Sequence, residues 1–208
     1  MNGSINPIYV NNTLQILEYR CFTLLIEGYN VVKSTKNITI DWNEEDISKE
    51  LILSLQTNKN RKDWNIRVEA EHRLYKNDGV PANKSPRIDF CFSALSVATE
   101  WEFFAEAKNL IENDSSKTGR KTKISATSLH KRYIETGINN YVSGKYPSNG
   151  CLLGYTLQGT ITNIIVSINE LLSNNKRQSE QLHFDNSIDC YISKHNELSL
   201  KHLMFDFA

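Results

Sequence analysis

The chain has 208 residues, 39% of them hydrophobic, and its 24 basic side chains balance 24 acidic ones. This length and composition predict one folded domain with a substantial core and argue against overall disorder. A formal net charge of zero excludes nucleic-acid binding through a broadly basic surface, so any such role must rest on a local patch or a partner. No apolar run approaches the roughly 18 residues of a membrane helix, so no membrane association is expected. The four scattered cysteines predict reduced thiols in the cytoplasm.

Two helices are predicted in the N-terminal part, over 8–57. Apolar residues recur at three- and four-residue steps across 8–27, which is typical of an amphipathic helix, and "GYN" at 28–30 is expected to end it. The second helix is expected to begin after Asn43, with acidic residues in its first turn. Its buried face would carry Ile47, Leu51 and Leu55.

The remaining elements alternate between strands and helices. Period-two alternation over 64–75 predicts a strand whose Ile66, Val68, Ala70, His72 and Leu74 share one face. Further strands are expected at 87–92, 101–110, 150–157, 187–195 and 198–207, with helices at about 125–141 and 160–175. The predicted order is therefore ααβββαβαββ, an α/β (α+β) fold with a central mixed sheet flanked by helices. It divides a single domain, 1–208, into N-terminal helices, a core over 64–157 and a C-terminal helix and strands over 160–207.

Two of these strands carry polar residues that the core does not explain. On the strand 101–110, Glu106 and Lys108 share a face and lie near its end. Asp89 on the preceding strand is expected to point away from Ile88 and Phe90, so antiparallel pairing would bring it to Glu106 and Lys108. Carboxylate oxygens are ligands that Mg²⁺ prefers, and a lysine can orient water or stabilise charge on a phosphate. The pattern predicts a divalent-metal site with a catalytic amine.

"PRID" at 86–89 followed by "EAK" at 106–108 resembles the PD-(D/E)xK restriction-endonuclease-like nuclease superfamily. The resemblance covers about 44–157 and implies a restriction-endonuclease-like core that hydrolyses phosphodiester bonds with Mg²⁺, for which Mn²⁺ can substitute. It assigns Asp89, Glu106 and the Ala107 carbonyl as metal ligands and Lys108 as the catalytic lysine.

Many members of this superfamily add a glutamate from the preceding helix or first strand, and the candidates here are Glu50, Glu69 and Glu71. The Gln-x-x-x-Tyr signature of exonuclease-type members is missing, because Gly137 stands four residues before Tyr141. By analogy, the resemblance favours an endonuclease of a bacterial restriction or phage-defence system.

The expected substrate is DNA, with RNA as an alternative. A basic segment downstream of the motif supplies the candidate phosphate contacts, which are Lys117, Arg120, Lys121, Lys123, Lys131 and Arg132. A double-strand cutter would gain from a two-fold dimer, and a partner subunit could supply DNA affinity. The zero net charge keeps open a different class of function, a non-catalytic nucleic-acid-binding or assembly subunit with the same fold.

Overall fold

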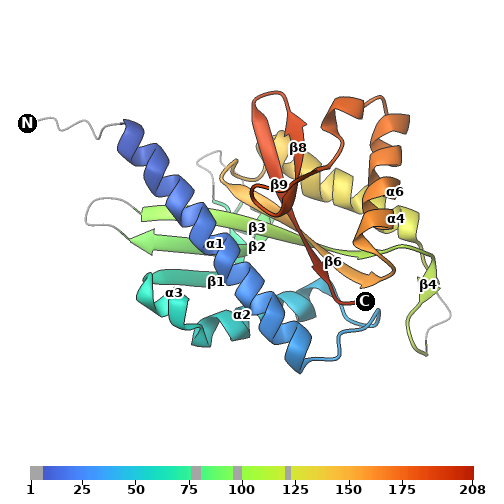
Figure 1. Ribbon diagram of the computed structural model, residues 1–208, viewed down its shortest axis with the longest axis horizontal. Helices are drawn as coiled ribbons and strands as arrows, with labels where there is room; N and C mark the ends of the chain where they lie inside the picture. The colour runs from blue at the N-terminus through green and yellow to red at the C-terminus, as the bar shows by residue number, and fades with distance from the viewer. Residues whose placement is uncertain (1–6, 76–80, 96–99, 120–122) are drawn as a thin grey trace, which may run out of the picture.

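The computed structural model describes residues 7–75, 81–95, 100–119 and 123–208. The chain forms an α+β fold in which a seven-stranded mixed sheet is flanked by helices (Figure 1). The helices are α1 (Pro7–Thr35), α2 (Glu44–Thr57), α3 (Lys59–Asp63), α4 (Ala126–Arg132), α5 (Asn139–Val142) and α6 (Ile161–Asn174), with the 3₁₀ turns η1 (Ala82–Lys84) and η3 (Gln178–Glu180) and the π-helical segment η2 (Tyr133–Ile138). The strands are β1 (Ile66–Arg73), β2 (Arg87–Leu95), β3 (Glu100–Ile111), β4 (Ser115–Ser116), β5 (Lys123–Ile124), β6 (Gly150–Gln158), β7 (His183–Asp185), β8 (Cys190–His195) and β9 (Leu198–Asp206). Within these residues no helix is both long and apolar enough to cross a membrane.

The sheet order is β1-β2-β3-β6-β9-β8-β7. The three central strands β3, β6 and β9 run parallel, and both margins are antiparallel meanders. The predicted antiparallel pairing of β2 with β3 is confirmed, with Phe90 opposite Ala105. Parallel strands need long crossover connections, and the helical segment 126–142 supplies the one between β3 and β6.

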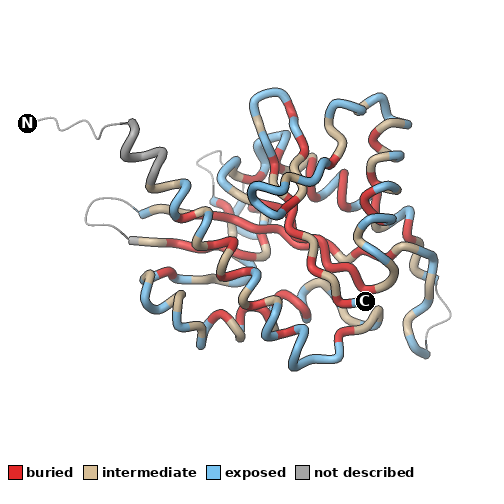
Figure 2. Tube along the Cα trace, viewed as in Figure 1, coloured by how far each residue is buried: buried red, intermediate tan, exposed pale blue. Residues whose placement is uncertain are grey.

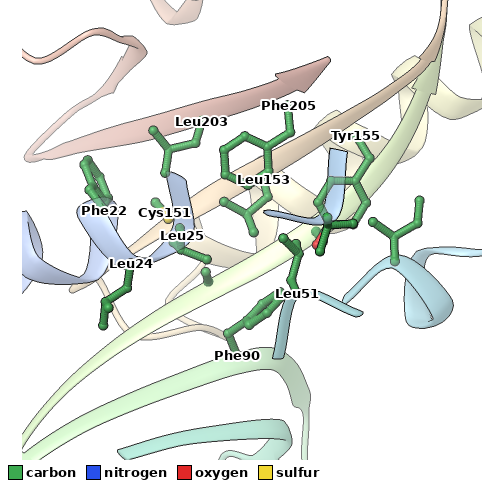
Figure 3. Close-up of a cluster of buried hydrophobic side chains, with 14 of the residues drawn as sticks. Phe22, Leu24, Leu25, Leu51, Phe90, Cys151, Leu153, Tyr155, Leu203 and Phe205 are labelled. Atoms are coloured by element: carbon green, nitrogen blue, oxygen red, sulfur yellow. The ribbon is translucent and has the colours of Figure 1, made fainter. Parts of the chain in front are cut away.

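One face of the sheet is covered by α1 and α2, whose apolar stripes meet alternate residues of the central strands. Figure 3 shows this contact, with Phe22, Leu24 and Leu25 of α1 and Leu51 of α2 against Phe90, Cys151, Leu153, Tyr155, Leu203 and Phe205 of the sheet. The burial map shows the central strands as the most buried part of the chain (Figure 2). Burying side chains of this size contributes roughly 1.5–3 kcal/mol each, so this layer supplies much of the stability.

The other face is covered by η2, α5 and α6. Tyr133, Ile138, Ile164 and Ile168 are fully buried there against sheet residues that include Leu152. The helix predicted over 125–141 is continuous, but its middle is π-helical. Gly137 lies in that segment where a Cβ atom would come within 2.8 Å of Leu152 Cδ2, so a larger residue there would require Leu152 to shift.

Several predicted boundaries are wrong in informative ways. Helix α1 continues through 28–30 to Thr35, because Gly28 lies where α1 crosses α2 and a Cβ there would contact Leu55 at 3.3 Å. The glycine therefore allows close packing and does not end the helix. Several short elements were not predicted: helix α3, the 3₁₀ turns η1 and η3, the β4–β5 ladder within the basic segment, and the edge strand β7.

A chain of hydrogen-bonded polar side chains runs from η2 through β9 and β8 to η3. Tyr133 OH lies 2.8 Å from His202 Nδ1, and Ser193 Oγ lies 2.8 Å from His202 Nε2 and 2.6 Å from His195 Nε2. His195 Nδ1 in turn contacts Glu180. Burial lowers the pKa of His202 to about 3, so this imidazole is neutral at physiological pH. The Ser193 hydroxyl therefore satisfies two buried imidazoles at once.

The Ser193→Ala variant is expected to lower the free energy of unfolding by about 2 to 4 kcal/mol, because it leaves two buried ring nitrogens without a partner. Ser199→Ala, at an exposed position of the adjacent strand β9, is the matched control and should change stability by less than about 0.5 kcal/mol. Urea unfolding of both variants measures the difference. Equal stabilities would mean that the polar chain contributes nothing.

Candidate metal and phosphate site

The candidate site begins at a paired irregularity in β1 and β2. The register sets Ala70 opposite Phe90 and His72 opposite Ile88, so Glu71 and Asp89 lie across from each other. Ile88 packs on one face of the sheet and Phe90 on the other, although they are only two residues apart. Glu71 has a left-handed backbone, with φ of 48°. Irregular backbone of this kind often re-aims side chains at functional sites.

This irregularity corrects two expectations about strand faces. Val68 packs on the α1 face and Leu74 on the opposite face, so β1 does not present the predicted series on one side. Ile88 and Phe90 likewise do not share a face, and Asp89 does not simply alternate with them. The expected alternation does hold on β3, where Phe103, Ala105 and Ala107 pack against α1 and α2 while Phe104 faces the other layer.

Glu106 and Lys108 lie on β3 in direct contact with each other, and the structure brings Asp89 to the same place. Lys108 Nζ donates to Glu106 Oε1 and, at 2.9 Å, to the carbonyl oxygen of Ala107. The backbone N–H of Ala107 donates to Asp89 Oδ2 at 2.7 Å. Both of these β3 side chains are buried, at 6% exposure for Glu106 and 4% for Lys108. The predicted cluster of Asp89, Glu106, Ala107 and Lys108 is therefore geometrically compact.

A second glutamate from α2 completes the cluster, and it is Glu44, which was not predicted. Glu44 Oε1 accepts a hydrogen bond from the backbone N–H of Asn109 at 3.2 Å, and its Oε2 lies 3.9 Å from Lys108 Nζ. Arg132 Nη2 donates to the same oxygen at 3.0 Å. The sequence signal was present, because Glu44 follows the helix cap Asn43, but acids in a first helical turn are usually explained by the helix dipole alone.

These side chains line a cavity of about 270 Å³, which we call the acidic cavity. Its acidic lining comprises Glu44, Glu45, Glu71, Asp89 and Glu106. Its basic lining comprises Arg87, Lys108, Arg132 and Lys145, and Tyr146 closes one side. Carboxylates beside several cations make a site that can hold both a divalent metal and a phosphate group.

Burial and mutual repulsion raise the pKa values of the two central acids. The pKa of Glu106 rises from 4.5 to about 7, first because the side chain is buried and then because Asp89 lies beside it, while Lys108 acts in the opposite direction. Burial also raises the pKa of Asp89, and the hydrogen bond from Ala107 partly offsets this. A divalent cation bound between the two acids would favour their charged forms and lower both pKa values.

Of the three glutamates predicted to complete the metal shell, only Glu71 lines the cavity. Glu50 forms an ion pair with Lys36 at 2.8 Å and is not part of the cavity lining. Glu69 pairs with Arg67 at 2.6 Å and with His72 at 2.8 Å. Glu71 does line the cavity, but its side chain is exposed and pairs with Arg87 at 2.8 Å. Glu44 is therefore the best-placed glutamate for completing a metal shell.

Of the basic residues predicted to contact phosphate, only some lie at the cavity. Arg132 lines the cavity, while Lys123 and Lys131 are exposed outside it. Lys117 is anchored to the loop before α2, where its Nζ donates to the Asp41 carbonyl at 3.0 Å and to Asn43 Oδ1 at 2.7 Å. Arg120 and Lys121 lie outside the residues that the structure describes. Arg87 and Lys145, which were not predicted, add positive charge at the cavity.

The donor set fits a hard divalent cation such as Mg²⁺. Glu106 Oε2 is buried and has no hydrogen-bond partner, although its companion oxygen is paired with Lys108. A buried carboxylate oxygen without a partner costs free energy unless an ion or solvent satisfies it. Asp89, Glu106, Glu44 and the Ala107 carbonyl all offer oxygen atoms, which Mg²⁺ and Mn²⁺ prefer.

Comparison of the chain with family models, curated proteins and solved structures gives no match.

Proposed function

We propose that this chain is a divalent-metal-dependent DNA endonuclease with its active site in the acidic cavity. The observation that carries the proposal is the convergence of Asp89, Glu106, Lys108 and Glu44, with one buried Glu106 oxygen left unpaired. The resemblance of "PRID" and "EAK" to the PD-(D/E)xK superfamily supports the same assignment. On that resemblance, a restriction or phage-defence setting is part of the proposal.

Asp89, Glu106 and the Ala107 carbonyl would hold the metal, and Glu44 would complete its protein ligands. When bound, such an ion lowers the pKa of a water molecule and offsets charge developing on the phosphate. The chain contributes the positioning. The Ala107 N–H fixes one oxygen of Asp89, and the Asn109 N–H fixes one oxygen of Glu44.

Lys108 and Arg132 supply the positive charge on the protein side. Lys108 lines the cavity, and its amine is held in place by Glu106 and the Ala107 carbonyl. A preorganised amine can orient water or stabilise charge in the transition state without reorganisation. Arg132 is half exposed and lies 3.0 Å from Glu44, which places its guanidinium where a phosphate could bind.

The proposal is tested by incubating the purified protein with supercoiled plasmid, linear duplex, single-stranded DNA and RNA, with Mg²⁺, with Mn²⁺ and with a chelator. Metal-dependent cleavage that the chelator abolishes is the expected result. Binding of DNA without any cleavage under these conditions would favour the non-catalytic alternative. Absence of both binding and cleavage with every substrate would contradict the proposal.

Glu44→Gln and Glu50→Gln form a discriminating pair within α2. Glu44→Gln is expected to reduce cleavage by about 10- to 100-fold, a loss typical of removing one group that supports a metal site. Glu50→Gln should leave the cleavage rate within about two-fold of wild type, because Glu50 pairs with Lys36 away from the cavity. Rates at saturating Mg²⁺ measure both. A larger loss for Glu50→Gln would overturn the assignment of Glu44.

A further inference from the structure

A second group of metal-ligating side chains lies on β1, β2 and β3, outside the lining of the acidic cavity. His72, Cys91 and Glu102 each offer one ligand atom, and all three atoms lie within 4.8 Å of one another. We propose that these three residues form a transition-metal site, with Zn²⁺ as the ion. This site does not depend on the proposed nuclease activity.

The backbone of β1 is what brings the histidine to this place. Simple alternation would put His72 on the same face as Val68, which packs against α1 and α2. The left-handed residue Glu71 precedes His72, and the imidazole lies instead on the other face, 6.1 Å from the Phe104 ring. Cys91 packs on that face as well. The sequence showed no metal-binding spacing because the three ligands come from three different strands.

The imidazole is already oriented as a metal-binding histidine usually is. Its Nδ1 lies 2.8 Å from Glu69 Oε2, so Nε2 is the nitrogen that we assign to the metal. Carboxylate–histidine pairs of this kind fix the ring and increase its basicity in metal sites. Glu69 would thus be a positioning residue for His72. It does not line the acidic cavity and has no role there.

The separation of two of the donors is close to that in a tetrahedral zinc site. Cys91 Sγ and Glu102 Oε1 are 3.8 Å apart. Zinc–sulfur and zinc–oxygen bonds of about 2.3 and 2.0 Å would separate the two atoms by about 3.5 Å. Small side-chain rotations would close the remaining difference. Three protein ligands of nitrogen, sulfur and oxygen type select Zn²⁺ over Mg²⁺, and water would take the fourth position.

Binding of Zn²⁺ would have to displace the proton of the Cys91 thiol. Burial and the neighbouring carboxylates Glu102 and Glu69 raise the pKa of the Cys91 thiol to about 12. A buried thiol among acids is a poor nucleophile, so a redox or catalytic role is disfavoured. A bound cation would reverse the local charge and hold the sulfur as thiolate. It would also link the three strands that carry Glu71, Asp89 and Glu106.

Cobalt titration of the metal-free protein tests the site, because thiolate-to-cobalt charge transfer gives a near-ultraviolet band that oxygen-only sites lack. Wild type is expected to show this band at one equivalent of Co²⁺, to lose it when Zn²⁺ is added, and to melt at a higher temperature with Zn²⁺. Cys91→Ser should lose the band and the thermal shift. Cys190→Ser, another buried free cysteine, is the matched control and should keep both.

His72→Gln serves as a second variant, since its side chain is only partly buried and the fold tolerates the change more readily. It is expected to weaken cobalt affinity at least ten-fold. Glu106→Gln should leave the band unchanged, which separates this site from the acidic cavity. A wild-type protein without the band, or a band that persists in Cys91→Ser, would overturn the proposal.

Discussion

Replacement of Lys108 by methionine is expected to reduce metal-dependent cleavage by about 10²- to 10³-fold, the loss that follows removal of one preorganised group that stabilises the transition state. Methionine keeps most of the length and apolar volume of the lysine stem, so the packing around this 4%-exposed position changes little. What disappears is the amine held by Glu106 and the Ala107 carbonyl. The effect should fall on kcat, because the substrate phosphates can still bind Arg132 and the other cations at the cavity.

Lys194→Met is the matched control for this experiment. Lys194 lies on β8 near the opposite edge of the sheet and is exposed, so its replacement should leave cleavage within two-fold of wild type. Single-turnover rates with excess protein separate the chemical step from product release. Full activity of Lys108→Met would remove Lys108 from the mechanism, even if the metal dependence of cleavage were confirmed.

Much of this site could be predicted from short-range geometry alone. Glu106 and Lys108 share a face of β3 because strand side chains alternate, and that alternation is regular from Phe103 to Ala107. Glu44 could not be predicted in the same way. Its approach to Lys108 depends on how α2 packs against the sheet, which joins residues more than 60 positions apart. The position of Glu44 after the helix cap Asn43 is equally explained by the helix dipole, so no local pattern marks it as a ligand.

The fold shows the same division between local and long-range information. The helix α6 and the strands β6 and β9 follow the hydrophobic pattern closely, since each is a regular element buried on at least one face, whereas β8 begins at Cys190, three residues later than predicted. The irregular features escaped prediction. No local pattern marks the left-handed Glu71, the π-helical segment at Tyr133–Ile138 or the uninterrupted helix at Gly28, and the glycines of the last two lie against leucines of distant elements. Glu71 lines the acidic cavity, and the π-helical segment lies in the crossover that follows β3.

Glu106 makes the metal-free protein less stable as the pH rises. Its pKa is raised from 4.5 to about 7 in the folded chain, so the folded state holds this proton more tightly than the unfolded state. The stabilising effect is complete below pH 4.5 and is lost as the pH rises through about 7. A shift of this size corresponds to about 3 kcal/mol between the two limits. Asp89, whose pKa burial also raises, acts in the same direction.

The Glu106→Gln variant separates this effect from the rest of the chain, because titrating groups that do not interact with Glu106 contribute equally to both proteins. In a chelator, the variant should be more stable than wild type by up to about 3 kcal/mol at pH 8, and the difference should largely vanish at pH 4.5. Mg²⁺ should stabilise wild type at pH 8 by offsetting the charges of Asp89 and Glu106, and it should stabilise the variant much less. Urea unfolding with and without Mg²⁺ at the two pH values measures all of these differences. If the stability difference is the same at both pH values, Glu106 does not carry the pH dependence. If Mg²⁺ stabilises both proteins equally, the ion binds elsewhere.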